Sequence, residues 1–267
     1  MDKIDYCYHT HTYRCGHAKG TDEEYVISAI KAGIKVLGFS DHVFLPGFPR
    51  IPTRGGEKEL EDYISSIKYL KEKYKDEIEI HIGLECEYKP AFHKYYESLL
   101  KSGDIEYLIL GQHYYIDDND PSIWILYNNM YDDFNMSNRY VRETLEAMDT
   151  GLFIYLAHPD LYVTMFNHWD DRCADYAHRI CKKAKELNMP LELNVNGLYW
   201  DHGDRLKYSF KEFFKIAKEY DNTVIIGYDS HRPSDFFRDE GLKYLLDIIK
   251  EFNLKHITRL ELPYGQH

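Results

Sequence analysis

Residues 36–42 of the chain read Val-Leu-Gly-Phe-Ser-Asp-His, an apolar run of strand length that ends in two polar residues. Apolar runs of this kind, each followed by a loop and an amphipathic segment, recur along the whole sequence. They are rich in Ile, Val, Leu and aromatic residues, as buried parallel strands are. The predicted strands are Ile4–Tyr8, Val36–Phe39, Ile78–Leu84, Tyr107–Leu110, Phe153–Ala157, Leu191–Val195 and Thr223–Gly227.

The segments between these runs carry apolar residues at helical spacing and predict helices. The predicted helices are Asp22–Ala32, Leu60–Tyr74, Met130–Met148, Asp171–Leu187, Ser209–Lys218 and Asp235–Glu251. Thr21 with Glu24, and Ser209 with Glu212, have the spacing of capping boxes. Strand–helix alternation over residues 1–267 predicts one α/β domain, a seven-unit (β/α)7 barrel with its chemistry at the C-terminal strand ends.

The composition of the chain disfavours several kinds of protein. The chain has 267 residues, 44% of them hydrophobic, and a formal net charge of −12, which disfavours binding to nucleic acid. Its five cysteines are odd in number and form no CxxC motif, so we expect free thiols in a reducing compartment. No signal region and no membrane-spanning apolar run is present, so the sequence predicts a cytoplasmic protein that does not contact a membrane.

Polar residues follow each predicted strand, at the point where its apolar run ends. They are His9, His11, Asp41, His42, Glu85, Glu87, His113, His158, Asp160, Asn194, Asn196, Asp229 and His231. The carboxyl ends of the strands of a β/α barrel meet at one face, so these side chains are expected to converge. Because side chains alternate along a strand, His9 and His11 point to the same side and suit chelation of one ion.

The residue types at these strand ends predict a metal site. Each histidine taken alone is more simply interpreted as a buried, hydrogen-bonded residue, and each carboxylate as a loop or cap residue. Seven histidines (the six in this list and His17) together with the carboxylates Glu85 and Asp229 are not explained in that way. Imidazole with carboxylate suits Zn, Fe and Mn, and so many ligands exceed the needs of one ion. Two or three ions that share a bridging carboxylate are therefore expected.

Eight short motifs occur in a recognisable order along the chain. They are His9-Thr10-His11, Cys15-Gly16-His17-Ala18, Phe39-Ser40-Asp41-His42, Gly83-Leu84-Glu85-Cys86-Glu87, Gly111-Gln112-His113, Ala157-His158-Pro159-Asp160, Glu192-Leu193-Asn194 and Gly227-Tyr228-Asp229-Ser230-His231-Arg232-Pro233. They span almost the whole chain. In type and order they resemble the polymerase-and-histidinol-phosphatase (PHP) family, and within it the monofunctional histidinol-phosphate phosphatases.

The resemblance implies a distorted seven-unit barrel that holds three divalent metal ions, of Zn, Fe or Mn. It assigns the first ion to His9, His11, Glu85 and Asp229, the second to Glu85, His113 and His158, and the third to His17, His42 and His231. It also implies catalytic roles for three residues. Asp229 would orient or deprotonate the attacking water, and His231 or Asp41 would assist the leaving alcohol.

The chain departs from that branch of the family at one point. The resemblance implies an arginine that grips phosphate just after an Asn-x-x-Gly segment, but residues 194–200 contain none. Arg54, Arg205 and Lys207 are the candidate replacements, although each by itself is equally well interpreted as solvated surface. Because arginine pairs with phosphate in a bidentate manner, its loss bears on the identity of the substrate. Tyr115 and Trp200 are candidate pocket residues for an aromatic or imidazole group.

Hydrolysis of a small phosphate monoester is the function that fits these features, with L-histidinol phosphate as substrate and histidine biosynthesis as the pathway. A PHP enzyme for another ester, such as a nucleotide or an aryl phosphate, is the first alternative. The second is a binding or proofreading module that accompanies a polymerase. The third is a histidine cluster that only stabilises the barrel. The oligomeric state stays open.

Overall fold

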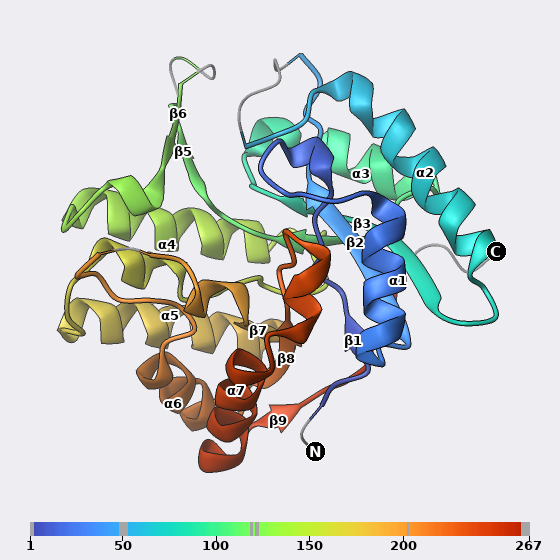
Figure 1. Ribbon diagram of the computed structural model, residues 1–267. Helices are drawn as coiled ribbons and strands as arrows, with labels where there is room; N and C mark the ends of the chain where they lie inside the picture. Colours follow the sequence, from blue (N-terminus) through green and yellow to red (C-terminus); the bar gives the residue numbers. More distant parts are fainter. Residues whose placement is uncertain (1–2, 48–52, 118–119, 121–122, 202, 263–267) are drawn as a thin grey trace.

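The computed structural model describes residues 3–47, 53–117, 120, 123–201 and 203–262. Its parallel strands form two groups at the centre of the molecule (Figure 1). The first group pairs in the order β1 (Tyr6–Cys7), β2 (Val36–His42), β3 (Glu79–Cys86) and β4 (Tyr107–Leu110). The second pairs in the order β7 (Leu191–Asn194), β8 (Thr223–Gly227) and β9 (Lys255–His256).

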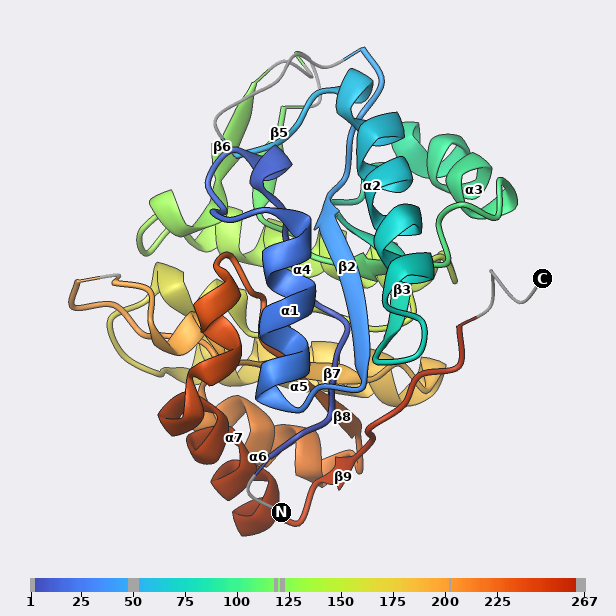
Figure 2. The ribbon, with the colours of Figure 1, turned by 45° about the vertical axis from the view of Figure 1, so that its right-hand side comes forward.

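Isolated parallel bridges connect the two groups. Leu156 bridges Leu110 at the end of β4 on one side and Leu191 at the start of β7 on the other. A further bridge joins Thr10, just after β1, to Ser230, just after β8. The strands therefore form a curled parallel sheet with the helices outside it, which is visible from two directions (Figures 1 and 2). The predicted α/β class is confirmed.

Three parts of the strand prediction differ from the structure. The two-residue strand β9 (Lys255–His256) was not predicted. The segment 153–157 pairs only through Leu156 and is not a regular strand in the described chain. An antiparallel hairpin of β5 (Tyr114–Ile116) and β6 (Trp124–Leu126) was not predicted, and it projects from the body of the molecule at the top of Figure 1. Its strands have three residues each, too few for a clear alternating pattern.

A helix lies in each segment that predicted one, with one helix added, although α4 and α7 each begin four residues later than predicted. The structure has α1 (Asp22–Ala32), α2 (Leu60–Lys73), α3 (His93–Lys101), α4 (Phe134–Met148), α5 (Asp171–Leu187), α6 (Lys211–Glu219) and α7 (Asp239–Phe252). Short 3-10 turns cover Tyr13–Cys15, Glu57–Glu59, Pro90–Phe92, Tyr127–Asn129, Leu161–Met165, Asn196–Leu198 and Pro233–Phe237. The added helix, α3, has nine residues and starts after a proline turn.

One predicted capping box is present and the other is wrong. The Thr21 hydroxyl accepts from the Glu24 N–H, and the Glu24 carboxylate accepts from the Thr21 N–H, so α1 begins as predicted. Helix α6 begins two residues later than expected, at Lys211. The Ser209 hydroxyl instead accepts a 2.7 Å hydrogen bond from the Asn194 N–H, at the end of β7. A tertiary contact has replaced the local one.

One apolar cluster fills the space inside and around the sheet and draws residues from every helix and most strands. All five cysteines are buried and free, so the expectation of free thiols is confirmed. Among the described residues, no helix has both the length and the apolar composition needed to cross a bilayer.

Candidate metal centre

The nine residues predicted to bind metal lie in one buried cluster. Most stand at or just after strand ends, and their rings contact one another across the curled sheet. Ring centroids are 4.3 Å apart for His11 and His42, 4.1 Å for His11 and His231, and 4.6 Å for His17 and His231. On the far side of the cluster, His113 and His158 are 4.7 Å apart. The convergence inferred from strand ends is therefore present in the folded chain.

Glu85, at the end of β3, is the centre of this cluster. Its Oε1 lies 2.8 Å from His158 Nε2, 3.4 Å from His113 Nε2 and 3.5 Å from His9 Nε2. Its Oε2 lies 2.9 Å from His42 Nδ1 and 3.4 Å from His11 Nε2. One carboxylate thus faces five imidazoles, as expected of a bridging ligand.

Asp229 faces the cluster from the opposite side. Its Oδ1 lies 3.1 Å from His11 Nε2 and 3.5 Å from His9 Nε2, while its Oδ2 accepts hydrogen bonds from the amides of Asn194 and Asn196. Asp229 has a φ of 51° and His158 a φ of 30°, a region that residues other than glycine rarely adopt. Such strained positions gather at functional sites, where the surrounding structure holds them in place.

Several buried polar atoms of the cluster have no hydrogen-bond partner among the described residues. They are His158 Nδ1, His231 Nε2, His11 Nδ1, His42 Nδ1 and Glu85 Oε2. The last two lie 2.9 Å apart, and His11 Nδ1 lies 3.5 Å from Asp41 Oδ1, but neither contact has the geometry of a hydrogen bond. His9 Nε2 and His11 Nε2 face each other at 3.2 Å. An unsatisfied buried polar atom costs about 1–3 kcal/mol, so a protein rarely gathers so many without a use for them. Divalent cations would satisfy these donor atoms, and the residues present therefore fit a metal centre.

The donor atoms divide into overlapping groups of three, in which each residue offers one ligand atom within 4.8 Å of the others. The groups include His9 with Glu85 and His158, His9 with His11 and Asp229, His11 with His42 and His231, and Cys15 with His17 and His231. They resemble the predicted sets, although His11 also lies beside the third one. Cys15 was not predicted as a neighbour of these ligands, and its place in Cys15-Gly16-His17 was the only signal for it.

Two carboxylates outside the predicted set orient the ligands. Glu192 Oε1 lies 2.8 Å from His9 Nδ1, and Glu192 Oε2 accepts from the His158 N–H at 3.0 Å. Glu87 Oε1 lies 3.0 Å from His113 Nδ1. Both stand two residues from another site residue on the same strand or strand end, Glu87 from Glu85 and Glu192 from Asn194, so strand alternation could have indicated them.

Two glycines leave room for these carboxylates. A Cβ atom at Gly111 would collide with the Glu85 carboxylate, and one at Gly227 would collide with that of Glu192. Both glycines belong to motifs that carry ligands, Gly111-Gln112-His113 and Gly227-Tyr228-Asp229. Because they have no side chain, these glycines let the backbone lie close to a buried carboxylate.

Replacing Glu192 by Gln is expected to weaken zinc binding about 10- to 100-fold, the usual cost of losing a carboxylate that orients a metal-binding histidine. The amide keeps the shape of the side chain but loses its charge on the His9 ring. Titration with a competing chromophoric chelator measures the change. Glu106→Gln is the matched control, because Glu106 is also buried and contacts a histidine, His81, away from the cluster. Equal affinities in the two variants would contradict the role of Glu192.

Neighbouring carboxylates raise the pKa of some histidines in the cluster, and burial lowers the pKa of others. Burial by itself lowers the pKa of His11, but the neighbouring Asp229 and Asp41 carboxylates raise it to about 9. The pKa of His9 is also raised, because Glu192, Asp229 and Glu85 outweigh its burial. Burial lowers the pKa of His42 and His231, with neighbouring cations adding to the effect. Burial also opposes a charge on His158, but the Glu85 carboxylate raises its pKa. In the metal-free protein, His9, His11 and His158 are therefore the members of the cluster that favour the protonated form.

Zinc affinity is expected to rise by at least about tenfold per pH unit between pH 6.5 and 8.5, because the metal must displace a proton from His11, whose pKa is about 9. Zinc affinity rises with pH because only one protonation state of imidazole is a metal ligand. Neutral imidazole binds metal, and the protonated form dominates below the pKa. Calorimetry in buffers of different ionisation enthalpy measures the released protons directly. Binding without proton release at pH 7 would contradict the charge state of His9 and His11.

Asp41 lies on the outer side of the cluster. It is fully buried, accepts from the Thr12 hydroxyl and from the His42 N–H, and has its Oδ1 3.5 Å from His11 Nδ1. It lines neither of the cavities described next. Its contacts suit orientation of His11 rather than contact with a bound ligand.

A cavity of about 250 Å³ opens onto the cluster. Five predicted ligands line it, namely His17, His42, His113, Asp229 and His231. The rest of its wall includes Arg54, Tyr114, Leu126, Leu161, Trp200 and Tyr208. The lining therefore combines proposed metal ligands with aromatic and aliphatic groups.

The predicted substrate contacts fall into two groups. Arg54 and Trp200 line the cavity, while Tyr115, Arg205 and Lys207 do not. The Arg205 guanidinium donates to the Asn128 carbonyl, and Lys207 is exposed. The Tyr115 hydroxyl donates to Asp117, so Tyr114 takes the place in the cavity wall expected for its neighbour.

Comparison with known proteins identifies the family of this chain. The family model described as "PHP domain" matches residues 8–196. A protein of Deinococcus radiodurans named probable histidinol-phosphatase is 29% identical over 246 residues, which cover 91% of this chain and 90% of the relative. The histidinol-phosphatase of Bacillus subtilis is 24% identical over 260 residues, covering 85% of this chain and 93% of that protein.

A solved structure shows the same fold. It is a histidinol phosphate phosphatase from Lactococcus lactis subsp. lactis in complex with zinc, L-histidinol and phosphate. It superimposes with a TM-score of 0.72 at 17% identity, over 97% of this chain and 99% of that one. The family model covers well over half of the sequence and includes most of the buried cluster, and the chain belongs to the PHP domain family.

Proposed function

We propose that this chain is a metal-dependent phosphatase that hydrolyses L-histidinol phosphate to L-histidinol and phosphate, in histidine biosynthesis. The observation that carries the proposal is the buried cluster of seven histidines with Glu85 and Asp229, open to a cavity of about 250 Å³. Its relatives from Deinococcus radiodurans and Bacillus subtilis, which match over most of their length, are named histidinol-phosphatases.

The proposed fold is a distorted seven-unit barrel with the metal site at the C-terminal strand ends. In this barrel, the segment around Leu156 takes the strand position between β4 and β7, and the sheet closes on itself where Thr10 pairs with Ser230. Two hydrogen bonds support this closure, from His11 N to Ser230 O at 2.9 Å and from Ser230 N to His9 O at 3.2 Å. They also hold the His9-Thr10-His11 motif against the end of β8.

The proposed centre holds three divalent ions of Zn, Fe or Mn. His9, His11, Glu85 and Asp229 hold the first, Glu85, His113 and His158 the second, and His17, His42 and His231 the third. When bound, such ions neutralise charge on phosphoryl oxygens and lower the pKa of coordinated water. The surrounding chain contributes rigidity, because Glu192, Glu87 and Asp41 fix the rings of His9, His113 and His11.

Asp229 is the proposed base that orients the attacking water. It lines the cavity, and the Asn194 and Asn196 amides hold its Oδ2, so the carboxylate keeps one orientation. Burial raises the pKa of Asp229 but the histidines around it lower it well below the usual range, which keeps the group ionised. His231 lines the same cavity and stays the candidate to assist the leaving alcohol, since Asp41 has no access to it.

Arg54 is the proposed contact for the substrate in the cavity lining. Its guanidinium is buried against Glu87, its Nη2 lies 3.4 Å from His113 Nδ1, and its Nε has no partner among the described residues. Tyr114, Tyr208 and Trp200 give the cavity flat surfaces on which an imidazole ring can stack. The partner is thus a small phosphorylated molecule. Nucleic acid and membrane are not expected partners of this acidic chain, and the proposed location is the cytoplasm.

Phosphate release by the zinc- or manganese-loaded protein tests this function. We expect turnover of L-histidinol phosphate to exceed that of an aryl phosphate and a nucleoside monophosphate by at least about 100-fold in kcat/KM. A preference for one of the other esters would keep the phosphatase and replace the substrate. No turnover of any ester would refute the proposal, and tight co-elution with a polymerase subunit would then favour a polymerase-associated module.

A further inference from the structure

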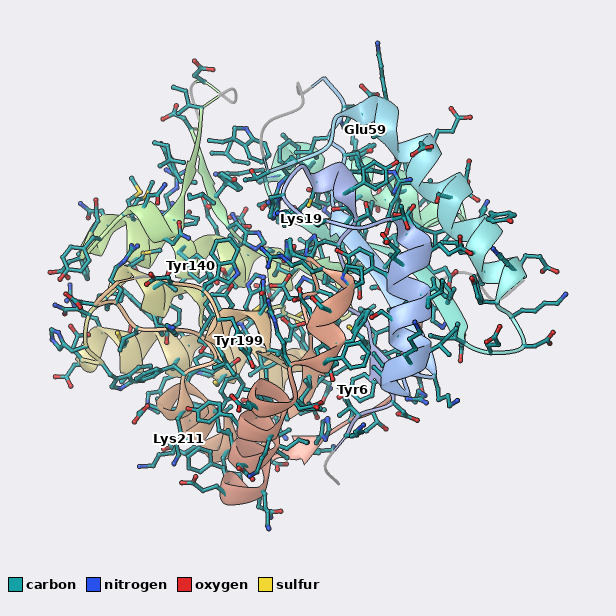
Figure 3. All side chains as sticks on the ribbon, in the orientation of Figure 1. Tyr6, Lys19, Glu59, Tyr140, Tyr199 and Lys211 are labelled. Atoms are coloured by element: carbon teal, nitrogen blue, oxygen red, sulfur yellow. The ribbon has the colours of Figure 1, made fainter. Side chains whose placement is uncertain are left out.

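A second cavity, of about 350 Å³, adjoins the first. The two share His17, Asn196, Trp200 and His231 in their walls, so they are parts of one depression over the histidine cluster. The second part is lined in addition by Tyr199, Asp201, Arg232, Asp235 and Arg238. Figure 3 shows Tyr199 in this region, on the segment that follows β7.

Three arginines line the two cavities, and they differ in how their charge is balanced. Arg54 pairs with Glu87. Arg238 pairs with Asp235 at 2.9 Å, donates to Asn196 Oδ1 at 2.6 Å and lies over the Tyr199 ring. Within the part of the chain that the structure describes, no carboxylate forms an ion pair with Arg232. Arg232 is exposed and lines the second cavity, so its guanidinium is solvated in the free protein and available to a ligand.

The turn that carries Arg232 is rigid. The backbone N–H groups of His231 and Arg232 both donate to Asp235 Oδ2 at 2.9 Å, and Asp235 is buried. The carbonyl of the next residue, Pro233, accepts a 2.6 Å hydrogen bond from the Ser28 hydroxyl on α1. The backbone of Arg232 is thus held in place relative to His231, and its side chain leaves the chain next to a proposed metal ligand.

We propose that Arg232 binds the phosphoryl group of the substrate, and so replaces the arginine absent after Asn194–Gly197. Arg232 lines the same cavity as His17 and His231, so an anion bound there would be attracted both by its guanidinium and by ions held on those histidines. A phosphoryl group supplies that anion, and its non-bridging oxygens match the planar guanidinium in a bidentate manner. This inference rests on the proposed phosphatase function for the identity of the ligand, but it can be tested without turnover.

The experiment is calorimetric titration of inorganic phosphate, and separately of L-histidinol, into the zinc-loaded protein. Wild type is compared with Arg232→Gln, Arg232→Lys and Lys19→Gln, with zinc content and thermal melting measured for each. Lys19 is the matched control. It is an exposed cation whose backbone N–H donates to the His231 carbonyl at 2.8 Å, but whose side chain lines neither cavity (Figure 3).

We expect Arg232→Gln to weaken phosphate binding about 10- to 100-fold, the value of a charge-assisted pair, and to leave L-histidinol binding within about twofold. Arg232→Lys should recover part of the loss, and Lys19→Gln should bind like wild type. Unchanged phosphate affinity in Arg232→Gln at full zinc content would overturn the inference. So would weaker binding of L-histidinol with normal binding of phosphate, which would place Arg232 at the alcohol instead.

Failure of the proposed function has a different signature. A wild-type protein that binds phosphate through Arg232 but does not hydrolyse any ester refutes the function and supports the anion site. A wild-type protein that hydrolyses L-histidinol phosphate, with an Arg232→Gln variant of equal phosphate affinity, supports the function and refutes the anion site.

Discussion

Glu85→Gln is expected to lower kcat/KM for phosphate-ester hydrolysis by about 1,000-fold, equivalent to about 4 kcal/mol of transition-state stabilisation. The reason is the position of its carboxylate, whose two oxygens lie within 3.5 Å of a nitrogen of each of five imidazoles. A glutamine keeps the volume but removes the negative charge and one acceptor oxygen. Two of the three proposed ions would lose a ligand at once.

Three measurements separate loss of the metal centre from loss of the fold: the rate of phosphate release, zinc content by mass spectrometry and far-UV circular dichroism. Glu106→Gln is again the control, because Glu106 is buried and bonded to His81 and Lys71 but lies away from the cluster. We expect it to retain activity within about threefold. Full zinc content with full activity in Glu85→Gln would contradict a bridging role.

Metal removal by a chelator is expected to abolish hydrolysis, lower the melting temperature and leave the secondary structure intact. An ion present at 1,000 times its Kd contributes about 4 kcal/mol of stability, which corresponds to roughly 10 °C in Tm for a chain of this size. The helices and sheet should survive because one apolar cluster, independent of the ligands, holds them together. Readdition of zinc or manganese should restore both properties.

The chelation experiment also distinguishes two uses of the histidines. Unfolding on metal removal would indicate a cluster that serves the stability of the barrel. A folded, inactive protein would indicate a catalytic centre. Activity that persists at zero metal content would refute the metal-dependent mechanism. The same treatment applied to Glu85→Gln should shift Tm less than in wild type, because that variant holds less metal at the start.

Much of the cluster could be predicted because parallel strands share a direction. Every ligand near a strand exit, such as His42 at the end of β2 or Glu85 at the end of β3, is carried to the same edge of the sheet once the strands pair. The register is visible in the structure, where His42 is the partner of Glu85 across the β2–β3 pair. The apolar runs placed the strands, so they also placed the ligands that follow them.

Residues that act through long-range contacts were harder to predict. Arg205 and Lys207 looked equivalent to Arg54 in the sequence, but only Arg54 lies in the cavity wall. Ser209 had the spacing of a helix cap, yet its hydroxyl bonds to the Asn194 N–H. In both cases the partner is distant along the chain, and local spacing holds no information about it.

The sequence by itself determined the alternation of strands and helices, the start of α1 at Thr21, and which histidines and carboxylates stand at strand ends. These follow from local propensity and from periodicity, which neighbouring residues decide. Only the tertiary structure decided that Glu85 lies among five imidazoles, that Glu192 orients His9, and that no carboxylate of the described residues pairs with Arg232. Such features depend on distances between residues far apart in the chain, and those distances exist only when the sheet has curled and its core has packed.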